Sequence, residues 1–233
     1  MRLNARLFFA VCFSVCAAGG GRLMAAPADD LKSVLERLNA AAANFHSTSA
    51  DVEFDTVDTD PLPDKDVQKG VVYYERKDGS VKMGVHLTEH NSKPRAKEYS
   101  FIGGTFKLFE PGINQVTTYA KAGKYESYII LGMGASGKDL QAKWDIKDLG
   151  AEALDGVKTE RLELVAKDAD VRKNLPKVTI WVDPDHAVSL KQDFTLSSTS
   201  SYVCHYANFK FNRALPSDAF MFKTDKNTVN RTQ

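Results

Sequence analysis

The chain has 233 residues, with 31 lysines and arginines against 30 aspartates and glutamates, and 43% of its residues are hydrophobic. This length and mixture suit one globular domain with its own core, and they exclude a disordered, collagen-like or disulfide-scaffolded chain. The formal charge of +1 gives no basis for nucleic-acid binding.

Residues 1–26 have the composition of a secretory signal peptide. Arg2 and Arg6 form a basic start, residues 7–18 are apolar, and a region rich in small residues follows, which ends in Ala25-Ala26-Pro27. The apolar run is shorter than the about 20 residues that a membrane-spanning helix needs. The sequence therefore predicts an exported protein whose mature domain comprises residues 27–233.

Two alternatives remain for this segment. Cleavage after Ala18 instead of Ala26 is one. Lipidation of Cys12 or Cys16 is the other, although a valine precedes each of them where lipoprotein signals usually have a small residue. Cleavage after Ala26 leaves Cys204 as the single cysteine, so no internal disulfide can form and stability must come from packing.

The clearest helix is predicted over residues 29–45, where Leu31, Val34, Leu35 and Leu38 recur at helical spacing. After this helix the apolar period changes to two, which is typical of strands. Strands are expected at 51–57, 70–76, 81–87, 99–102, 105–109, 114–119, 157–166, 178–182, 188–196 and 202–211.

Turn signals between these runs indicate successive hairpins. Asp78-Gly79 and Gly103-Gly104 each join two strands, and Asp183-Pro184-Asp185 is a third turn. Residues 59–69 are expected to form a loop, residues 124–150 short helical pieces and loop, and the C-terminus a polar tail. The fold class predicted is α+β and mostly antiparallel: one half-open, curved β-barrel of roughly ten strands, covered by the N-terminal helix and short helices.

Two strands show the pattern of a sheet with one buried face. Val188, Leu190, Phe194 and Leu196 share one face of their strand, and Val81, Met83, Val85 and Leu87 share one face of theirs. An ordinary sheet core under the helix explains this pattern. A concave face that is only partly filled, leaving an apolar ligand cavity, explains it equally well, and one helix is scant cover for so many strands.

Several motifs suggest chemistry that their context does not support. The segment Gly132–Lys138 matches nucleotide-binding glycine patterns, but Asp139 follows the lysine and no parallel βαβ unit is predicted, so a flexible loop is the better interpretation. His86 and His90 lie too far apart on a strand for a metal site. Cys204 and His205 point to opposite faces of a strand. We therefore expect no nucleotide, metal, cofactor or catalytic site.

Arg76 follows Val72 and Tyr74 at strand spacing, so it belongs to the same face. If that face is concave, the guanidinium lies at the edge of the cavity and needs hydrogen-bond acceptors there. The alternative is that Tyr73 shares the buried face and that Arg76 is solvated.

The chain resembles the outer-membrane lipoprotein carrier (LolA-like) family over about residues 29–223. No single motif carries the resemblance; the order of several segments does. These segments are Leu31–Phe45, Gly70–Arg76, Leu131–Leu140, Leu149–Val157, Val178–Pro184 with Leu190-Lys191-Gln192, and Phe209–Asn212 with Leu215-Pro216 and Phe220.

This resemblance implies an incomplete antiparallel barrel with a helical lid over an apolar cavity that shields lipoprotein acyl chains in the periplasm. It implies that Arg76 locks the lid by hydrogen bonds to the lid backbone, although Lys77 follows it where the family often has proline. The cavity is expected to be lined by Val72, Tyr74, Met83, Val85, Leu190 and Phe194.

The function expected is that of a non-enzymatic periplasmic carrier, which ferries lipoproteins or related lipids toward the outer membrane. Its partners would be acylated lipoproteins or lipids, an inner-membrane release complex and an outer-membrane acceptor, with no nucleic acid or nucleotide. The alternative is a periplasmic lipid-sensing module on the same scaffold, which signals to a protein partner. An enzyme such as a hydrolase would need a catalytic group in the cavity.

Overall fold

The computed structural model describes residues 30–233 except 78, 79 and 121, and omits the side chains of residues 124, 125 and 127. The predicted signal peptide and the Asp78-Gly79 turn lie outside the described residues. Twelve strands of the described chain form one sheet in the order β12-β6-β5-β4-β3-β2-β1-β11-β10-β9-β8-β7. The strands are β1 (Ser47–Asp58), β2 (Asp64–Lys77), β3 (Ser80–His90), β4 (Lys93–Ile102), β5 (Thr105–Glu110), β6 (Gln115–Tyr119), β7 (Trp144–Leu154), β8 (Val157–Ala166), β9 (Lys177–Asp183), β10 (Val188–Thr195), β11 (Ser200–Phe211) and β12 (Val229–Thr232).

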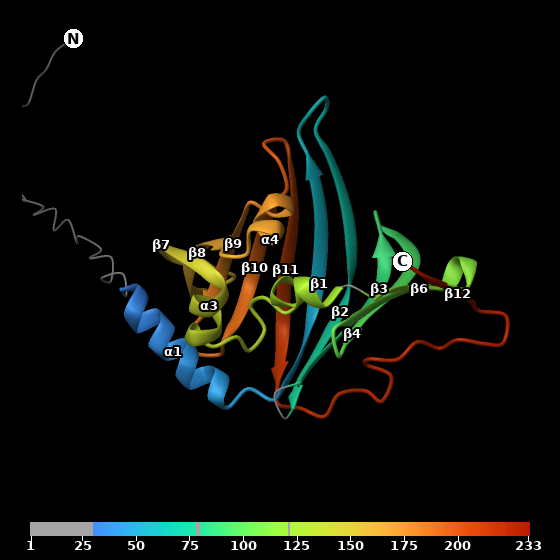
Figure 1. Cartoon of the computed structure of the whole chain (residues 1–233), viewed down its shortest axis with the longest axis horizontal. Coiled ribbons are helices and arrows are strands. Elements are labelled where there is room, and N and C mark those ends of the chain that lie inside the picture. Colours follow the sequence, from blue (N-terminus) through green and yellow to red (C-terminus); the bar gives the residue numbers. More distant parts are fainter. Residues whose placement is uncertain (1–29, 78–79, 121) are drawn as a thin grey trace, which may run out of the picture.

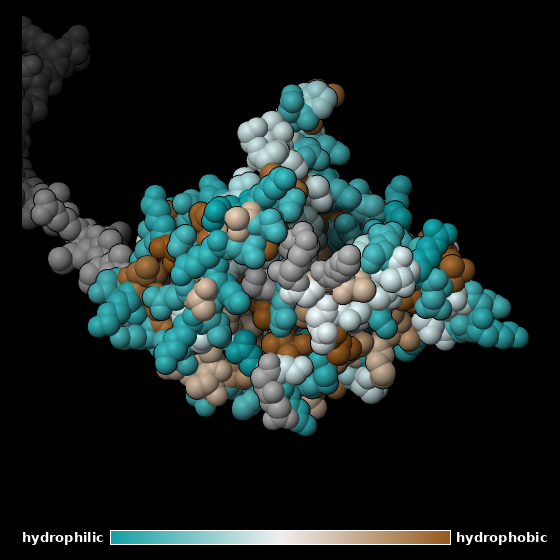
Figure 2. All heavy atoms as spheres, viewed as in Figure 1, coloured by the Kyte–Doolittle hydropathy of each residue, from teal (hydrophilic) through white to brown (hydrophobic). Residues whose placement is uncertain are grey.

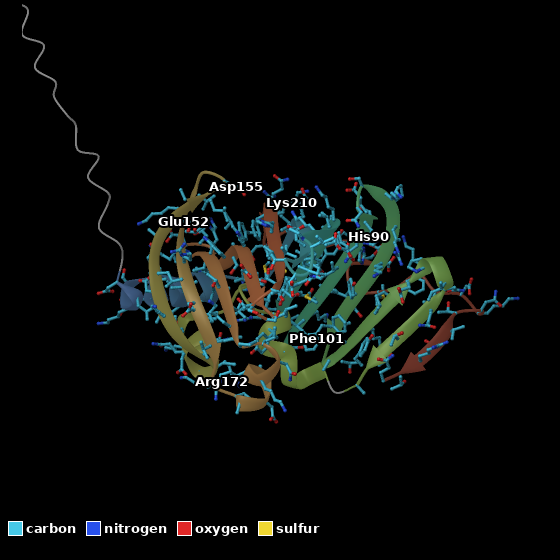
Figure 3. All side chains as sticks on the ribbon, turned by 90° about the horizontal axis from the view of Figure 1, so that it is seen from above. His90, Phe101, Glu152, Asp155, Arg172 and Lys210 are labelled. Atoms are coloured by element: carbon cyan, nitrogen blue, oxygen red, sulfur yellow. The ribbon has the colours of Figure 1, made fainter. Side chains whose placement is uncertain are left out.

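The sheet is antiparallel at every pairing except that of β12 with β6. Its two halves meet where β1 pairs with β11, and β12 and β7 form its edges, so the barrel stays open. Seen from above, the sheet is bent: Glu152, Lys210 and His90 lie on one side of it and Arg172 of α4 lies on the other (Figure 3). This confirms the predicted open, curved, mostly antiparallel fold.

Helices cover part of the sheet (Figure 1). They are α1 (Leu31–Ala43), α2 (Glu126–Ile129), α3 (Gly137–Lys143) and α4 (Ala169–Asn174), with 3-10 turns η1 (Pro111–Ile113) and η2 (Ala122–Tyr125). The Asp30 carboxylate caps α1 by accepting the Ser33 N–H at 2.7 Å, which satisfies one of the free donors of the first turn. The face of α1 that carries Val34, Leu35 and Leu38 is buried in the core, as its spacing predicts.

Several predicted boundaries were wrong, and three elements were not expected at all. β1 begins at Ser47 and not at residue 51, and β4 begins at Lys93 and not at residue 99. β2 begins at Asp64 inside the expected loop, β7 begins at Trp144 inside the expected helical stretch, α4 forms in a segment for which no helix was expected, and β12 forms within the expected polar tail. In the first part of β2 the pairing is supported by charge rather than by apolar residues, since the Lys65 and Lys69 ammonium groups lie 2.8 Å from carboxylate oxygens of β1. Apolar periodicity does not detect such a strand.

The hairpin at Gly103-Gly104 is confirmed: both glycines have positive φ, +56° and +77°, and they connect β4 to β5. The β9–β10 turn after Asp183 is also confirmed.

On the outer face, Gly84 of β3 lies under the C-terminal segment. A Cβ at this position would lie 1.8 Å from the carbonyl oxygen of the fully buried Ala219, so only glycine fits there.

Candidate ligand cavity

An apolar cavity of about 440 Å³ lies between the sheet and the segment of residues 126–134, which we call the lid segment. The lid segment contains α2 and crosses in front of β11 and β1 (Figure 1). Aromatic and aliphatic side chains dominate the wall of the apolar cavity. The lining residues are Phe54, Thr56, Val72, Tyr74, Met83, Val85, Tyr99, Phe106, Tyr128, Ile129, Met133, Leu175, Gln192, Phe194, Leu196, Tyr202, Cys204 and Tyr206.

Five of the six residues expected at the cavity lie on its wall. Four of them, Val72 and Tyr74 on β2 and Met83 and Val85 on β3, come from neighbouring strands, and Phe194 comes from β10. They are brought together because β2 and β3 pair with Val72 opposite Val85 and Tyr74 opposite Met83. Contact of these residues with a ligand remains a prediction.

Leu190 is the exception, because it is buried in the core with 6% exposure and does not line the cavity. The start of β10 is covered by the lid segment: Met133 forms a bridge with Val188, and the Ser189 N–H donates to the Gly132 carbonyl at 2.7 Å. The β10–β9 register also shifts between Ser189 and Lys191. The open part of the β10 face therefore begins only at Gln192.

Two side chains of the cavity wall hold the lid backbone. The Tyr74 hydroxyl donates to the Ile129 carbonyl at 3.3 Å, and the Gln192 amide donates to the Leu131 carbonyl at 2.5 Å. Gln192 is only 2% exposed, and its carbonyl accepts the Tyr206 hydroxyl at 3.2 Å. Buried polar groups of this kind are stable only when they are paired, so the position of the lid satisfies them.

Sequence reasoning missed Gln192 as a functional candidate, although a signal was present. Gln192 lies between Leu190 and Phe194 on the apolar face of its strand. An amide at such a position needs buried partners, and the sequence alone does not show which backbone groups come near it.

The glycine-rich stretch is tightly packed, and our expectation of a flexible loop was wrong. Gly132 and Gly134 have positive φ of +70° and +69°, and a Cβ would come within 2.1 Å of the Ser189 hydroxyl and 2.3 Å of the Phe45 ring, respectively. A Cβ on Gly137, at the start of α3, would lie 2.4 Å from the Leu35 carbonyl oxygen of α1. Gly132 and Gly134 therefore allow the lid segment to pack closely against β10 and Phe45, and Gly137 allows α3 to pack closely against α1.

Asp139, which argued against a phosphate loop, has a local structural role. The Ser136 hydroxyl accepts the Asp139 N–H, and an Asp139 carboxylate oxygen accepts the Ser136 N–H, both at 3.1 Å. This capping box fixes the start of α3.

Arg76 lies on the same face as Val72 and Tyr74, as its spacing predicts, and its side chain is 26% exposed. Its guanidinium lies 3.8 Å from the Asp139 carboxylate. Among the residues that the structure describes, Asp139 is the one polar side-chain partner of Arg76. The side-chain hydrogen bonds to the lid backbone come from Tyr74 and Gln192. Tyr74 reaches the lid backbone because the lid segment crosses β2 at this residue, and Arg76 lies two residues further along the strand. The locking role of Arg76 remains a prediction.

The polar groups of the cavity wall are uncharged at neutral pH. Burial is the main cause that raises the pKa of the Cys204 thiol and of the Tyr74, Tyr202 and Tyr206 hydroxyls above their ordinary values. Cys204 faces the cavity while the half-exposed His205 lies on the other face, so the two do not form a nucleophile–base pair. The described residues contain no cluster of three or more potential metal ligands.

The fold can be compared with known proteins at this point. No protein-family model and no curated protein matches the sequence. Among solved structures, an uncharacterized conserved protein from Thermus thermophilus matches with a TM-score of 0.53 and 10% identity, covering 88% of this chain and 100% of that one. MucB matches with a TM-score of 0.51 and 12% identity, covering 86% of this chain and 65% of MucB. The fold of this chain is therefore similar to the folds of these two proteins.

A LolA superfamily protein from Nitrosomonas europaea is also among the matches, with 19% identity and a TM-score of 0.42, covering 82% of this chain and 97% of that one. Within the described residues no helix is long and apolar enough to cross a bilayer.

Proposed function

We propose that this protein is a non-enzymatic periplasmic carrier, which encloses the acyl chains of lipoproteins or related lipids and ferries them toward the outer membrane. The observation that carries the proposal is the apolar cavity of about 440 Å³ under the lid segment. Its size falls in the range of about 300–1,000 Å³ that is usual for small-ligand sites.

The chemistry of the wall favours a hydrocarbon chain. Its polar members (Thr56, Gln192, Cys204 and the tyrosines) are neutral, and Gln192, Tyr74 and Tyr206 already have protein partners. A charged ligand group would lose its hydration there without gaining a counterion. An acyl chain would gain about 0.8 kcal/mol for each methylene group that it buries.

The lid attachment suits reversible loading. The side-chain bonds from Tyr74 and Gln192 each contribute about 0.5–1.5 kcal/mol net. Backbone bonds add two more attachments: Ser189 N–H to the Gly132 carbonyl at 2.7 Å, and Gly134 N–H to the Ala187 carbonyl at 2.8 Å. A carrier must release its cargo, and a lid held by a few such bonds can open at a cost that ligand or acceptor binding can supply.

The test is to fill the cavity with a side chain. Val72→Trp places a large ring on the wall, and we expect binding of a fluorescent fatty alcohol to fall by at least about tenfold, since the chain loses several buried methylene groups. Val229→Trp is the matched control, because Val229 is 48% exposed on β12, away from the cavity.

Mass spectrometry of lipid that co-purifies with the native protein should identify an acylated species, and the Val72→Trp variant should lose it. Unchanged loading of that variant contradicts the proposal. Transfer to acceptor vesicles separates the carrier from the sensing module, since a sensor would retain its lipid and form a stable complex with a protein partner instead.

A further inference from the structure

A second cavity, of about 670 Å³, lies on the other side of the lid segment, and we call it the charged cavity. Its apolar floor comes from the lid, from α3 and from the ends of β3 and β7, and its rim carries charges of both signs. The lining residues are Arg76, Val81, Gly123, Glu126, Ile130, Leu131, Ala135, Asp139, Leu140, Ala142, Lys143, Trp144 and Asp168.

The two cavities share their walls. Along β2, Val72 and Tyr74 line the apolar cavity and Arg76, two residues further on the same face, lines the charged cavity. Along β3, Met83 lines the first and Val81 the second. Residues two apart on a strand are separated by about 6.6 Å, so the two spaces adjoin.

The lid segment is the partition between them. Tyr128, Ile129 and Met133 face the apolar cavity, whereas Glu126, Ile130 and Leu131 face the charged one. The lid crosses the shared wall at Tyr74, whose hydroxyl donates to Ile129. Lifting of the lid would therefore join both spaces into one site that is apolar at one end and charged at the other.

Two of the three acidic side chains that line the charged cavity already accept hydrogen bonds from backbone N–H groups at helix starts. Asp168 caps α4 by accepting the N–H groups of Asp170 and Val171, and Asp139 forms the capping box of α3. Glu126 is the third acid, and Arg76 and Lys143 are the cations. Arg76 is three-quarters buried, and its contact with Asp139 is a long one of 3.8 Å. Within the described part of the chain, Asp139 is the one side-chain partner of Arg76, so the other N–H donors of its guanidinium can turn to a ligand.

We infer that the charged cavity binds the polar end of the same acylated ligand whose chain occupies the apolar cavity, with an anionic carboxylate or phosphate group on Arg76. This inference rests on the proposed carrier function. Guanidinium groups bind such anions in a bidentate fashion, and a partly buried guanidinium binds them more strongly than an exposed one. Lys143 adds a second positive charge at the rim, and Glu126 would accept an ammonium group of a zwitterionic head.

The test compares amphiphiles that share one chain and differ in the head: palmitate, hexadecyl phosphate and palmityl alcohol. Calorimetric titration measures the affinity of each for the full mature protein and for Arg76→Met. We expect the variant to bind palmitate and hexadecyl phosphate about tenfold more weakly while binding of the alcohol changes little, since it loses a charge-assisted hydrogen bond only to the anionic heads. Lys143→Met should weaken the anionic ligands about two- to fivefold.

Trp144 supplies a local signal, because it lines the charged cavity. In a Trp181→Phe background it is the remaining tryptophan, and its fluorescence should change with the anionic ligands more than with the alcohol. Arg213→Met is the matched control, since Arg213 is exposed and does not line either cavity. Inorganic phosphate alone should leave Trp144 unchanged at concentrations at which hexadecyl phosphate saturates.

The outcomes separate this inference from the proposed function. If all three ligands bind the wild type and Arg76→Met and Lys143→Met weaken them equally or not at all, the head subsite is wrong while the carrier function stands. If palmityl alcohol does not bind the wild type, the carrier function itself fails. A Trp144 response to free phosphate equal to that for hexadecyl phosphate also overturns the inference, because the site would then take a free anion. Circular dichroism of each variant shows whether it is folded.

Discussion

The single residues that matter most here are polar side chains on an otherwise apolar wall. Tyr74 and Gln192 are almost completely buried, and each donates its hydrogen bond to a carbonyl of the lid segment. A buried donor that loses its partner is costly, so the closed lid is the arrangement that satisfies both. Lid closure is thus built into the cavity wall itself.

Gln192→Leu tests this role. The substitution keeps the approximate size and leaves the Leu131 carbonyl and the Tyr206 hydroxyl without their partner. We expect the free energy of unfolding in urea to fall by about 1–3 kcal/mol and amide exchange of residues 126–134 to accelerate. Tyr206→Phe is the control, because it removes only the outer bond and should leave lid exchange nearly unchanged. Equal lid exchange in wild type and Gln192→Leu would contradict the role.

At the scale of elements, the lid depends on glycine. The stretch 132–137 brings three glycines against β10, the Phe45 ring and α1 in turn, and at each of them a Cβ would overlap a neighbouring atom. The pattern that resembles a nucleotide motif is therefore explained by packing. Close approach and positive φ select glycine at helix–sheet junctions just as they do in phosphate loops.

Gly134→Ala should destabilise the protein by about 2–4 kcal/mol, because it combines the strain of a positive φ with a contact of 2.3 Å to the Phe45 ring. Gly150→Ala is the matched control: its φ is +89°, but nothing lies within 4 Å of the added Cβ, so it carries the backbone strain alone and should cost about 1 kcal/mol. Thermal unfolding measures both. A Gly134→Ala variant no less stable than Gly150→Ala would show that the lid is loosely packed.

At the scale of the whole molecule, many charged side chains form ion pairs, whereas the wall of the apolar cavity carries no charged side chain. Figure 2 shows that hydrophilic residues cover most of the face in view. The Lys69 ammonium lowers the pKa of Glu53, the Arg37 guanidinium lowers the pKa of Asp185, and the Lys223 ammonium lowers the pKa of Asp218. The Arg37–Asp185 pair, with contacts of 2.9 and 2.7 Å, also fastens α1 to the β9–β10 turn.

These lowered pKa values predict acid sensitivity. A carboxylate whose pKa is lower in the folded protein contributes stability above its unfolded pKa and loses it as the pH falls through the folded value. The melting temperature should therefore fall progressively as the pH is lowered from about 5 toward about 3. Asp185→Asn should melt slightly below the wild type at neutral pH and show a shallower fall in acid. A parallel fall in both proteins would mean that the pair contributes nothing.

Much of the fold followed from local patterns. The N-terminal helix, expected over 29–45 and observed over 31–43, the hairpin at Gly103-Gly104 and the common face of Val72, Tyr74 and Arg76 were predicted. Periodicity and turn chemistry are encoded in neighbouring residues, which is why these features could be predicted. The start of β2 and all of β12 were not predicted. Both are mostly polar and largely exposed, and they form strands because a neighbouring strand supplies backbone hydrogen-bond partners: β1 for the start of β2, and β6 for β12.

The sequence by itself determined a mostly antiparallel, one-face-buried sheet and the residues of its apolar face, since side-chain alternation depends only on the backbone. Only the tertiary structure decided which of these residues line a space and which are core. Alternation along the sequence assigns Leu190 and Phe194 to one face of their strand, yet Leu190 is packed in the core, next to a register shift, and Phe194 lines the apolar cavity. It also decided that Gln192 meets the lid and that Arg76 borders a second cavity, because those contacts join segments about sixty residues apart.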